Sequence, residues 1–444
     1  MRDSGLKIAQ TRVLEGGRDT LNNKAVDVLV IGAGIIGLSV AEKLVDQGLK
    51  VTLIEKEEVA AGASRGNAAG LAFSDIMPLA SPGMVKKSIK WLMDPLGPFS
   101  VVPGDLPFTM TWLLRFLRAS RSSQFEKSIV GQASLMELGQ TSFQTVLERT
   151  GLKSMIRDNG ALHLYQSRES YRRDQANWQY RARHGLDYSC YEGQALHEFQ
   201  SGLSDRFLAG VFVPAWSSVS DPADYCHALY KHLIRRGASV VYGEVKSIDP
   251  GNGSQDRTVE VILDSGQQLE ARQVVIAAGP WSAELSKQLG DKVPMVGERG
   301  YNTTLPQAAL LNPIERTLVF SDHGFVFTPL ENGYRIGGAS EIARLDRAPN
   351  YRRSKLMAEK ASQFLPGLEI KEGKEWMGAR PSTPDTLPVI DYSTRSRNIV
   401  YAFGHGHLGL TQSTATAQLV SELLLRETPS IDIEPLQVKR FAWR

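Results

Sequence analysis

Residues 26–56 constrain the fold of this 444-residue chain more than any other stretch. The segment Val26–Ile31 is aliphatic apart from Asp27, as expected of a strand buried on both faces in a parallel sheet. A turn with glycine at positions 32, 34 and 37 follows it directly. Glycines at this spacing let the chain turn tightly and let its backbone approach a phosphate group. The stretch therefore predicts an α/β domain that holds a phosphate-bearing ligand.

A helix and a second strand complete the unit. The residues after Gly37 have helical spacing, Gly48 ends the helix, and the strand at residues 51–54 is followed by Glu55. The N-terminus of such a helix offers unpaired N–H groups to a pyrophosphate, and Glu55 is placed to accept hydrogen bonds from a ribose diol. This order of elements is typical of a Rossmann-like dinucleotide site. An acidic residue at this position favours FAD or NAD over NADP.

The composition restricts the class of protein. The length favours two domains, and 42% hydrophobic with 22% charged residues indicates a globular chain. A net charge of +3 gives no reason to expect a nucleic-acid partner. The two cysteines, Cys190 and Cys226, lack metal-ligand spacing, so we expect no disulfide framework, no zinc site and a reducing, cytoplasmic compartment.

Other segments bear on location. Residues 1–24 are polar and lack the apolar core of a secretory signal, so we interpret them as an N-terminal extension. No run approaches the roughly 20 apolar residues that span a bilayer. Residues 85–93 and 112–118 combine basic residues with apolar residues at helical spacing. Such helices either pack on the rest of the protein or dock on an anionic membrane surface, and the sequence leaves both interpretations open.

A second glycine-rich turn, at residues 404–411, lies between a strand at 400–403 and a helix at 415–424. A helix N-terminus carries about half a positive charge, which would stabilise the negative charge on a flavin ring that accepts a hydride. A nicotinamide enzyme needs no such second turn, so this feature favours FAD. Residues 60–70 and 277–281 are rich in small residues and fit either the flat cofactor or plain turns.

Patterns along the rest of the chain predict a cofactor domain that a second domain interrupts. Further helices are expected at residues 126–150 and 221–236. Strands are expected at residues 160–164, 208–213, 239–242, 243–248, 258–263, 274–278, 301–305, 317–320, 324–328 and 333–338. We predict a two-domain α/β (α+β) chain, with a Rossmann-like FAD-binding domain at residues 25–76, 221–290 and 375–444 interleaved with a mixed-sheet substrate domain at residues 77–220 and 291–374.

Arg380 is the main candidate for substrate binding. It stands in a segment stiffened by Pro381 and Pro384, which we predict to be a rigid turn. A fixed guanidinium suits bidentate capture of a carboxylate, whereas pairing with Asp385 would make the arginine structural. His405 and His407, two residues apart, make a poor metal site without further ligands, so no metal is expected.

Taken together, these motifs resemble the FAD-dependent D-amino-acid dehydrogenases of the glycine oxidase and D-amino-acid oxidase superfamily. The resemblance covers residues 26–425. It is carried by VLVIGAGIIGLSVAEKL at 28–44, SRGNAAGL at 64–71, the tryptophan-containing region 82–118, VVIAAGPWS at 274–282, GARPSTPDTLPVI at 378–390 and GHGHLGLT at 404–411. The ERGYN segment at 298–302 and the GHGHLGLTQ segment are similar to those of members associated with hydroxyproline catabolism.

The resemblance implies roles for particular residues. It implies that Arg380 binds the substrate carboxylate and that Tyr301 reaches the substrate; with His405, these are the predicted catalytic residues. Neither cysteine falls where sarcosine oxidases attach flavin covalently, so we expect noncovalent FAD. The predicted FAD-binding residues are Gly32, Gly34, Ile35, Ile36, Gly37, Glu55, Lys56, Ser64, Arg65, Asn67, Ala68, Ala69, Gly70, Val245, Ala278, Gly279, Gly378, Gly404, Gly406, His407, Leu408, Gly409, Leu410 and Thr411.

The reaction expected from the resemblance is oxidation of a D-amino acid by hydride transfer from its α-carbon to N5 of the flavin. The hydroxyproline type implies a cyclic substrate such as cis-4-hydroxy-D-proline or D-proline. His323, His405 and His407 are candidates for a general base, although a substrate that binds with a neutral amine needs none.

The partners expected are the small-molecule substrate and an electron acceptor, either a quinone or another protein. A quinone would give the basic helices a use on the inner face of the membrane, and an oligomer is also compatible with the sequence. Two alternatives stay open: a glycine- or sarcosine-type secondary amine oxidase that uses O2, and a flavoprotein electron-transfer subunit of a hetero-oligomer.

Overall fold

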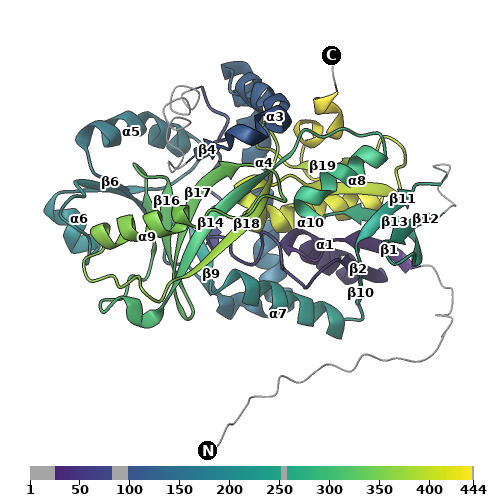
Figure 1. The fold of residues 1–444 in the computed structure, drawn as a ribbon, viewed down its shortest axis with the longest axis horizontal. Helices are drawn as coiled ribbons and strands as arrows, with labels where there is room; N and C mark the ends of the chain where they lie inside the picture. Colours follow the sequence, from purple (N-terminus) through teal and green to yellow (C-terminus); the bar gives the residue numbers. More distant parts are fainter. Residues whose placement is uncertain (1–25, 83–98, 252–257, 443–444) are drawn as a thin grey trace, which may run out of the picture.

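The computed structural model describes residues 26–82, 99–251 and 258–442. Within these ranges the chain forms two large β-sheets that lie side by side, with helices packed against them (Figure 1). The expected extension at residues 1–24 and the expected basic helix at residues 85–93 lie outside the described residues. In the described ranges, no helix is both long and apolar enough to cross a bilayer.

The first sheet has eight strands and contains the expected parallel unit. Its strand order is β10-β2-β1-β13-β12-β11, and β20 pairs with both β13 and β19. β1 runs parallel to β2 and β13, and β20 runs parallel to the end of β13, so their carboxyl ends meet at one edge. The strands are β1 (Val26–Ile31), β2 (Val51–Glu55), β10 (Ser239–Tyr242), β11 (Val245–Asp249), β12 (Val259–Leu263), β13 (Gln268–Ile276), β19 (Val389–Tyr392) and β20 (Ile399–Phe403).

Alternate residues of β1 face two hydrophobic cores. Val28 and Val30 pack with residues of α1, α7 and α10, whereas Leu29 and Ile31 pack with residues of α8 and β12. Because both faces are buried, the strand needs an apolar side chain at nearly every position, which explains its aliphatic sequence. The helices at this sheet are α1 (Ile35–Asp46), α7 (Pro222–Arg235), α8 (Ser282–Gln288) and α10 (Gly409–Leu424), and α4 (Ser122–Thr150) packs on α10.

The second sheet has nine strands and is mostly antiparallel. Its order is β18-β14-β17-β16-β15-β6-β8-β7, and β4 pairs with β17. Helix α9 (Arg352–Phe364) packs against β14 and β17. The strands are β4 (Phe99–Val101), β6 (Ala161–Tyr165), β7 (Ser189–Glu192), β8 (Ala209–Val213), β14 (Val296–Pro306), β15 (Thr317–Phe320), β16 (Phe325–Leu330), β17 (Gly333–Ile342) and β18 (Lys374–Ser382).

Smaller elements connect the two sheets. A three-stranded sheet consists of β3 (Gly70–Leu71), β9 (Ser217–Val219) and β5 (Ile156–Arg157). The remaining α-helices are α3 (Leu106–Ala119), α5 (Arg168–Arg183) and α6 (Gln194–Phe199). Short 3-10 helices are η1 (Pro103–Asp105), η2 (Leu152–Met155), η3 (Gly279–Trp281), η4 (Gln307–Ala309), η5 (Gly406–Leu408), η6 (Glu434–Leu436) and η7 (Val438–Phe441).

The elements expected from sequence patterns are present, with one correction. Asp221 caps α7 as predicted, because its Oδ1 accepts hydrogen bonds from the backbone N–H groups of Ala223 at 2.8 Å and Asp224 at 3.2 Å. The expectation of a rigid turn at residues 378–381 is wrong, since they lie in strand β18. Residues 375–382, expected in the cofactor domain, are therefore part of the nine-stranded sheet. The other domain boundaries stay a prediction.

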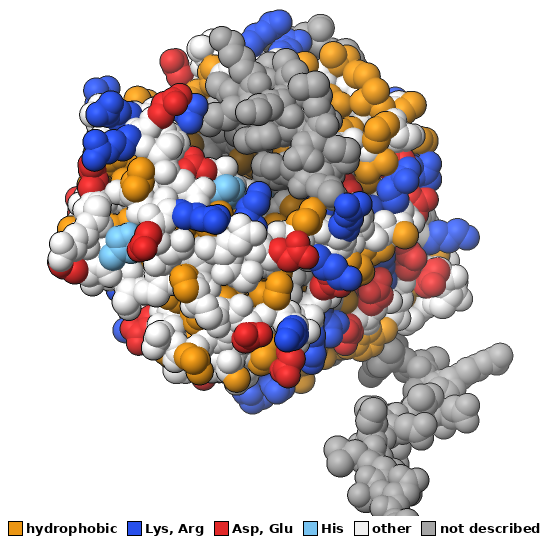
Figure 2. Space-filling view, turned by 60° about the vertical axis from the view of Figure 1, so that its left-hand side comes forward, with side chains coloured by type: hydrophobic (Ala, Val, Ile, Leu, Met, Phe, Trp, Pro, Cys, Tyr) orange, Lys and Arg blue, Asp and Glu red, His pale blue; other side chains and the backbone are white. Residues whose placement is uncertain are grey.

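The surface carries charges of both signs. On the face drawn in Figure 2, lysine and arginine side chains are interspersed with aspartate and glutamate, and hydrophobic side chains gather toward the upper right. This mixture agrees with the small net charge of +3.

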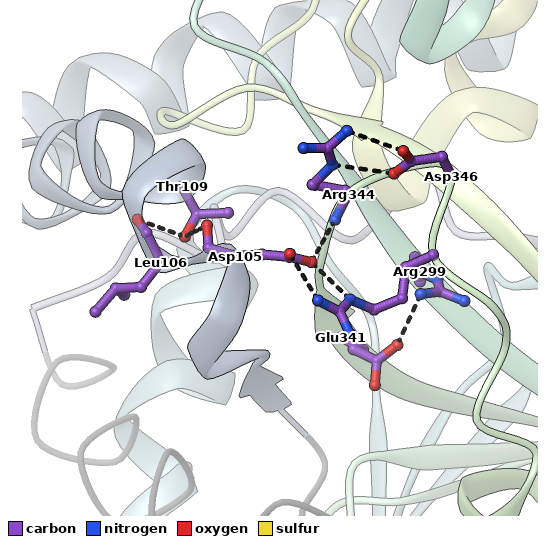
Figure 3. Close-up of polar contacts among 8 residues, drawn as sticks. Asp105, Leu106, Thr109, Arg299, Glu341, Arg344 and Asp346 are labelled. Atoms are coloured by element: carbon purple, nitrogen blue, oxygen red, sulfur yellow. Dashed lines mark hydrogen bonds and ion pairs between the residues drawn. The ribbon is translucent and has the colours of Figure 1, made fainter.

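A buried aspartate fastens α3 to the nine-stranded sheet (Figure 3). Arg347 donates to both carboxylate oxygens of Asp105 at 2.8 and 2.9 Å, and the backbone N–H of Arg344 donates at 2.9 Å. The hydrogen bond from Arg347, helped by that from Arg344, lowers the pKa of Asp105 to about 2. The segment after β17 and the start of α3 are thereby held together.

We expect Asp105→Asn to lower the stability of the protein, because Arg347 would lose its charged partner. The pKa of Asp105 is lower in the folded than in the unfolded chain, so its contribution is complete above about pH 5 and is lost as the pH falls toward about 2. The Tm of the variant should lie a few degrees below that of wild type at about pH 7, and the gap should shrink as the pH falls from about 5 to about 3. Asp346→Asn, at a side chain 68% exposed, is the matched control and should change Tm little. A gap that is constant with pH would contradict this account.

Candidate functional site

A cavity of about 1020 Å³ lies where the two sheets meet. Its walls include the carboxyl edge of the eight-stranded sheet, at Gly32, Glu55 and Ala278, and residues of the nine-stranded sheet such as Gly300 and Arg380. Because the parallel strands β1, β2, β13 and β20 all end at this edge, the segments that follow them converge on one space. The cavity is the candidate site.

The three glycines of the first turn have different tasks. A Cβ at Gly32, whose φ is +106°, would lie 2.5 Å from the Ala277 oxygen, and a Cβ at Gly37 would lie 1.9 Å from the Gly32 oxygen. Both glycines therefore allow close packing of backbone on backbone. A Cβ at Gly34 would meet only the Ser64 Oγ, at 3.2 Å, and Gly34 borders the cavity. Gly34 thus leaves a path for a ligand to approach the N-terminus of α1.

Glu55 lies beside this turn, as the motif predicts. Its Oε2 accepts a hydrogen bond from the backbone N–H of Ala33 at 2.8 Å, and its Oε1 accepts one from Lys56 at 2.9 Å. Next to it the Lys56 Nζ lies 3.7 Å from the centre of the Trp281 ring. A carboxylate fixed at the edge of the cavity, next to the backbone left open at Gly34, fits the ribose and pyrophosphate of the expected FAD.

The second glycine-rich turn, at residues 404–411, also contributes to the wall of the cavity. Gly406 has a φ of +52° and begins η5, which leads directly into α10. The first residues of α10, including Gly409 and Thr411, border the cavity. The Thr411 Oγ1 accepts a hydrogen bond from the backbone N–H of Ala72 at 3.1 Å, which ties α10 to the end of the small-residue loop. The positive end of α10 is thus presented to the cavity, as a flavin ring requires.

All but four of the residues predicted to bind FAD border the cavity. Gly37 packs on Gly32, and the exposed Arg65 pairs with Glu58. Ala69 is fully buried, and a Cβ at Gly404 would lie 2.8 Å from the Thr383 side chain. Residues 277–281 also border the cavity. The roles of the bordering residues in binding stay predictions.

Arg380 is held by a buried carboxylate that the sequence interpretation missed. In the antiparallel pair of β14 and β18, Glu298 lies opposite Arg380. The Arg380 Nη1 donates to Glu298 Oε1 and to Ser340 Oγ, each at 3.2 Å. Asp385, the alternative partner considered for Arg380, is instead paired with Arg440 at 2.8 Å. Arg380 is therefore fixed by sheet pairing and by Glu298 rather than by a proline-stiffened turn.

Glu298 collects further donors. His407 Nε2 lies 2.6 Å from its Oε1, Ser382 Oγ donates to its Oε2 at 2.8 Å, and Ser340 Oγ also donates to Oε1. Burial opposes ionisation of Glu298, but the hydrogen bond from His407, the charge of Arg380 and the hydrogen bond from Ser340 act against burial. Together they hold the pKa of Glu298 below its usual value. The carboxylate is therefore charged under physiological conditions.

Glycines make room for the side chains at this wall. A Cβ at Gly300 would lie 2.4 Å from the Arg380 Cζ, so the guanidinium lies across the glycine. In the same way the Trp376 ring packs against Gly66 and Gly378, where a Cβ would lie within 2.4 and 2.0 Å of ring atoms. These contacts join the small-residue loop of the cofactor wall to the nine-stranded sheet.

The prediction that the Tyr301 hydroxyl reaches the substrate is corrected. Although Tyr301 borders the cavity, its hydroxyl donates to Glu341 Oε2 at 2.7 Å and accepts from the backbone N–H of Asn350 at 3.1 Å. Side chains alternate along a strand, so the side chains of Arg299 and Tyr301 lie on the face of β14 opposite to Glu298 and Gly300. On that side Arg299 pairs with Glu341 at 3.4 Å (Figure 3).

The three histidines considered as bases occupy different environments. His323 does not border the cavity, and its Nε2 lies 2.7 Å from Gln166 Oε1. His405 borders the cavity but is buried, with Nε2 2.8 Å from Thr416 Oγ1, and burial lowers its pKa to about 3. A base with so low a pKa takes up few protons at neutral pH, which argues against the predicted catalytic role of His405. His407 borders the cavity with its side chain 34% exposed.

Comparisons with known proteins agree with this geometry. The family described as FAD dependent oxidoreductase (DAO) matches residues 27–423. The chain is 32% identical over 421 residues to a D-amino-acid oxidase of Bradyrhizobium diazoefficiens, covering 93% of this chain and 98% of that protein. It is 27% identical over 419 residues to a D-amino acid dehydrogenase of Rhizobium johnstonii, covering 93% and 99%.

Solved structures share the fold. Glycine oxidase from Geobacillus kaustophilus has a TM-score of 0.71 at 22% identity, covering 94% of this chain and 99% of that one. L-proline dehydrogenase from P. horikoshii has a TM-score of 0.71 at 19% identity, covering 94% and 98%. At these identities the likeness concerns the fold alone.

Substitutions at two glycines of the first turn should distinguish an effect on FAD binding from an effect on folding. We expect Gly34→Val to raise the Kd for FAD about 100-fold or more, because its side chain would enter the cavity, and to leave the Tm of the apoprotein nearly unchanged. Gly37→Ala, in contrast, should lower the Tm of the apoprotein, because its Cβ would overlap the Gly32 oxygen. Titration of the apoproteins with FAD and thermal denaturation measure both effects. Wild-type affinity for FAD in Gly34→Val would contradict the assignment.

Proposed function

The chain belongs to the DAO family of FAD-dependent oxidoreductases, as its motifs predict, and we propose that it oxidises a D-amino acid at the α-carbon. Relatives named D-amino-acid oxidase and D-amino acid dehydrogenase, aligned over 93% of this chain, support the substrate class. FAD, when bound, supplies the acceptor for the hydride of the α-carbon. The residues of the chain bind the amino acid, orient it and exclude water.

The guanidinium of Arg380 is the observation that carries this proposal. Glu298 and Ser340 both contact its Nη1, and in the described part of the chain Nη2 and Nε have no hydrogen-bond partner. These two nitrogens are available for the bidentate capture of a carboxylate. Because two paired strands and Glu298 hold the guanidinium before the substrate arrives, little side-chain entropy is lost on binding.

For the finer substrate class we propose a cyclic D-amino acid such as D-proline or cis-4-hydroxy-D-proline. The support is the similarity of the ERGYN and GHGHLGLTQ segments to members associated with hydroxyproline catabolism. Both segments border the cavity, through Gly300 and Asn302 in the first and through residues 405–411 in the second. A secondary amine in a ring yields a cyclic imine, which does not release ammonia on formation.

For the electron acceptor we propose a quinone, reached at a membrane surface through α3. One outward face of α3 exposes Leu106, Met110, Leu114 and Leu117, whereas the exposed Phe108 lies on another side of the helix, against Arg344. Arg118 and Arg121 are exposed at the end of this helix, so the apolar stripe is flanked by positive charge. On the inner face of α3, Trp112 Nε1 donates to the Ser382 oxygen at 2.9 Å, which couples the helix to the strand that carries Arg380.

Removal of the guanidinium tests the proposed function. We expect Arg380→Ala to raise KM for D-proline about 100-fold, because a charge-assisted bidentate contact contributes on the order of 2–3 kcal/mol. Arg380→Lys should recover only part of this loss, since an ammonium cannot bind a carboxylate with two parallel hydrogen bonds. Steady-state kinetics with an artificial electron acceptor measure both values.

Arg272→Ala is the matched control for Arg380. Arg272 is 74% exposed and pairs with Asp27 outside the cavity, so its removal should leave KM unchanged. An unchanged KM in Arg380→Ala, for every D-amino acid that the wild type oxidises, would contradict the proposal.

The membrane contact is tested with vesicles. We expect the wild-type protein to sediment with vesicles that contain phosphatidylglycerol and not with purely zwitterionic ones. The double substitution Leu114→Glu and Leu117→Glu should abolish sedimentation, because carboxylates would replace the apolar stripe and oppose the anionic surface.

Leu311→Glu serves as the control, since Leu311 is 91% exposed but lies outside α3. It should sediment like wild type. In the same vesicles, loaded with ubiquinone, the reduced flavin should be reoxidised faster than by air. Faster reoxidation by air, with no binding to either vesicle, would favour an oxidase that uses O2.

A further inference from the structure

Glu298 cannot itself contact a substrate, because other groups of the chain occupy its carboxylate. It is 4% exposed, its Oε1 lies near Arg380, Ser340 and His407, and its Oε2 accepts from Ser382. A carboxylate buried this deeply costs free energy unless charged or hydrogen-bonding partners compensate. Its effect on a bound molecule must therefore pass through a neighbour that borders the cavity.

His407 is the neighbour with a free position. Its Nε2 lies 2.6 Å from Glu298 Oε1, which fixes the ring and keeps a proton on Nε2. In that tautomer Nδ1 carries a lone pair, and in the described part of the chain no group forms a hydrogen bond to it. The side chain borders the cavity and is 34% exposed. The arrangement leaves one imidazole nitrogen of this cavity-bordering residue able to accept a proton.

We propose that His407 accepts the ammonium proton of the substrate, with Glu298 as the residue that positions its ring. The step rests on the proposed oxidation of an amino acid. The N–H bond of the ammonium breaks, its electron pair stays on the amine nitrogen, and the proton forms a new N–H bond at Nδ1. The neutral amine then has the lone pair that stabilises the cation developing at the α-carbon. The imidazolium forms an ion pair with Glu298.

One oxygen of Glu298 holds Arg380 and His407 next to each other. Arg380 Nη1 and His407 Nε2 both contact Oε1 of Glu298, at 3.2 and 2.6 Å. A guanidinium and an imidazole held by one oxygen lie close enough to meet a carboxylate and an amine that one carbon atom separates. The shared carboxylate thereby sets both the site for the acid group and the site for the amine.

Glu298 favours this transfer, whereas the charge of Arg380 and the positive N-terminus of α10 oppose it. Glu298 on β14 contacts His407, and Arg380 on β18 contacts Glu298. The hydroxyls of Ser340 and Ser382 complete the cluster. The N-terminus of α10 follows His407 in the chain. The negative charge of Glu298 compensates the imidazolium, while Arg380 keeps the carboxylate ionised. His405 and His323 do not share this environment, because they bond to Thr416 and Gln166.

The test is the pH dependence of flavin reduction by D-proline, followed anaerobically in the FAD-bound enzyme by stopped flow. We expect His407→Asn to reduce the rate constant of flavin reduction about 100-fold near pH 7. This rate constant should recover at higher pH, where the substrate amine is already neutral in solution. Added imidazole should restore part of the rate in His407→Ala. Glu298→Gln should shift the pH profile in the same direction as His407→Asn, but less, since the amide oxygen still accepts from Nε2.

Two readouts separate this role from a structural one. Benzoate is a carboxylate without an amine; its binding is to be followed through the flavin absorbance spectrum, and we expect its Kd to be nearly unchanged in His407→Asn. His323→Asn, outside the cavity, should keep the wild-type pH profile. A wild-type profile in His407→Asn, or a Kd for benzoate raised 10-fold or more, would overturn the proton-transfer role while leaving the proposed oxidation intact. If wild-type flavin is reduced by no D-amino acid, the proposed function itself fails.

Discussion

The ion pair of Glu298 with Arg380, in the sheet that borders the cavity, is the interaction on which the candidate site depends. Two charges this poorly exposed are tolerated only because His407, Ser340 and Ser382 complete the hydrogen bonding of the carboxylate. Loss of Arg380 would remove a charged partner from a buried carboxylate. The same carboxylate fixes the direction of a guanidinium and an imidazole, so one residue that touches no substrate organises two that border the cavity.

The cofactor half of the site follows from strand direction. β1, β2, β13 and β20 are parallel where they meet, so four segments of the chain end at one edge of the sheet. Small residues at these ends leave the cavity open, and the N-termini of α1 and α10 both point to it. The nine-stranded sheet then closes the space through β14 and β18. The candidate site therefore lies where the two sheets meet, not within either one.

Local patterns in the sequence predict the first sheet well, because a strand buried on both faces and a glycine-rich turn can each be recognised from a few consecutive residues. The sequence failed where the outcome depends on distant partners. Residues 378–381 contain glycine and proline and suggest a turn, but pairing with β14 makes them a strand. Because side chains alternate along a strand, Tyr301 and Glu298 lie on opposite faces of β14. The alternation within the ERGYN segment could therefore have identified Glu298 as the residue on the same face as Arg380. The pairing of Asp385 with Arg440 joins residues that no local pattern connects.

The most direct test is a crystal structure of the FAD-bound protein with benzoate. The account predicts that the benzoate carboxylate lies within hydrogen-bonding distance of Nη2 and Nε of Arg380, while Nη1 keeps its contact with Glu298. Benzoate bound elsewhere in the cavity, or an Arg380 side chain turned away from Glu298 to another partner, would contradict it.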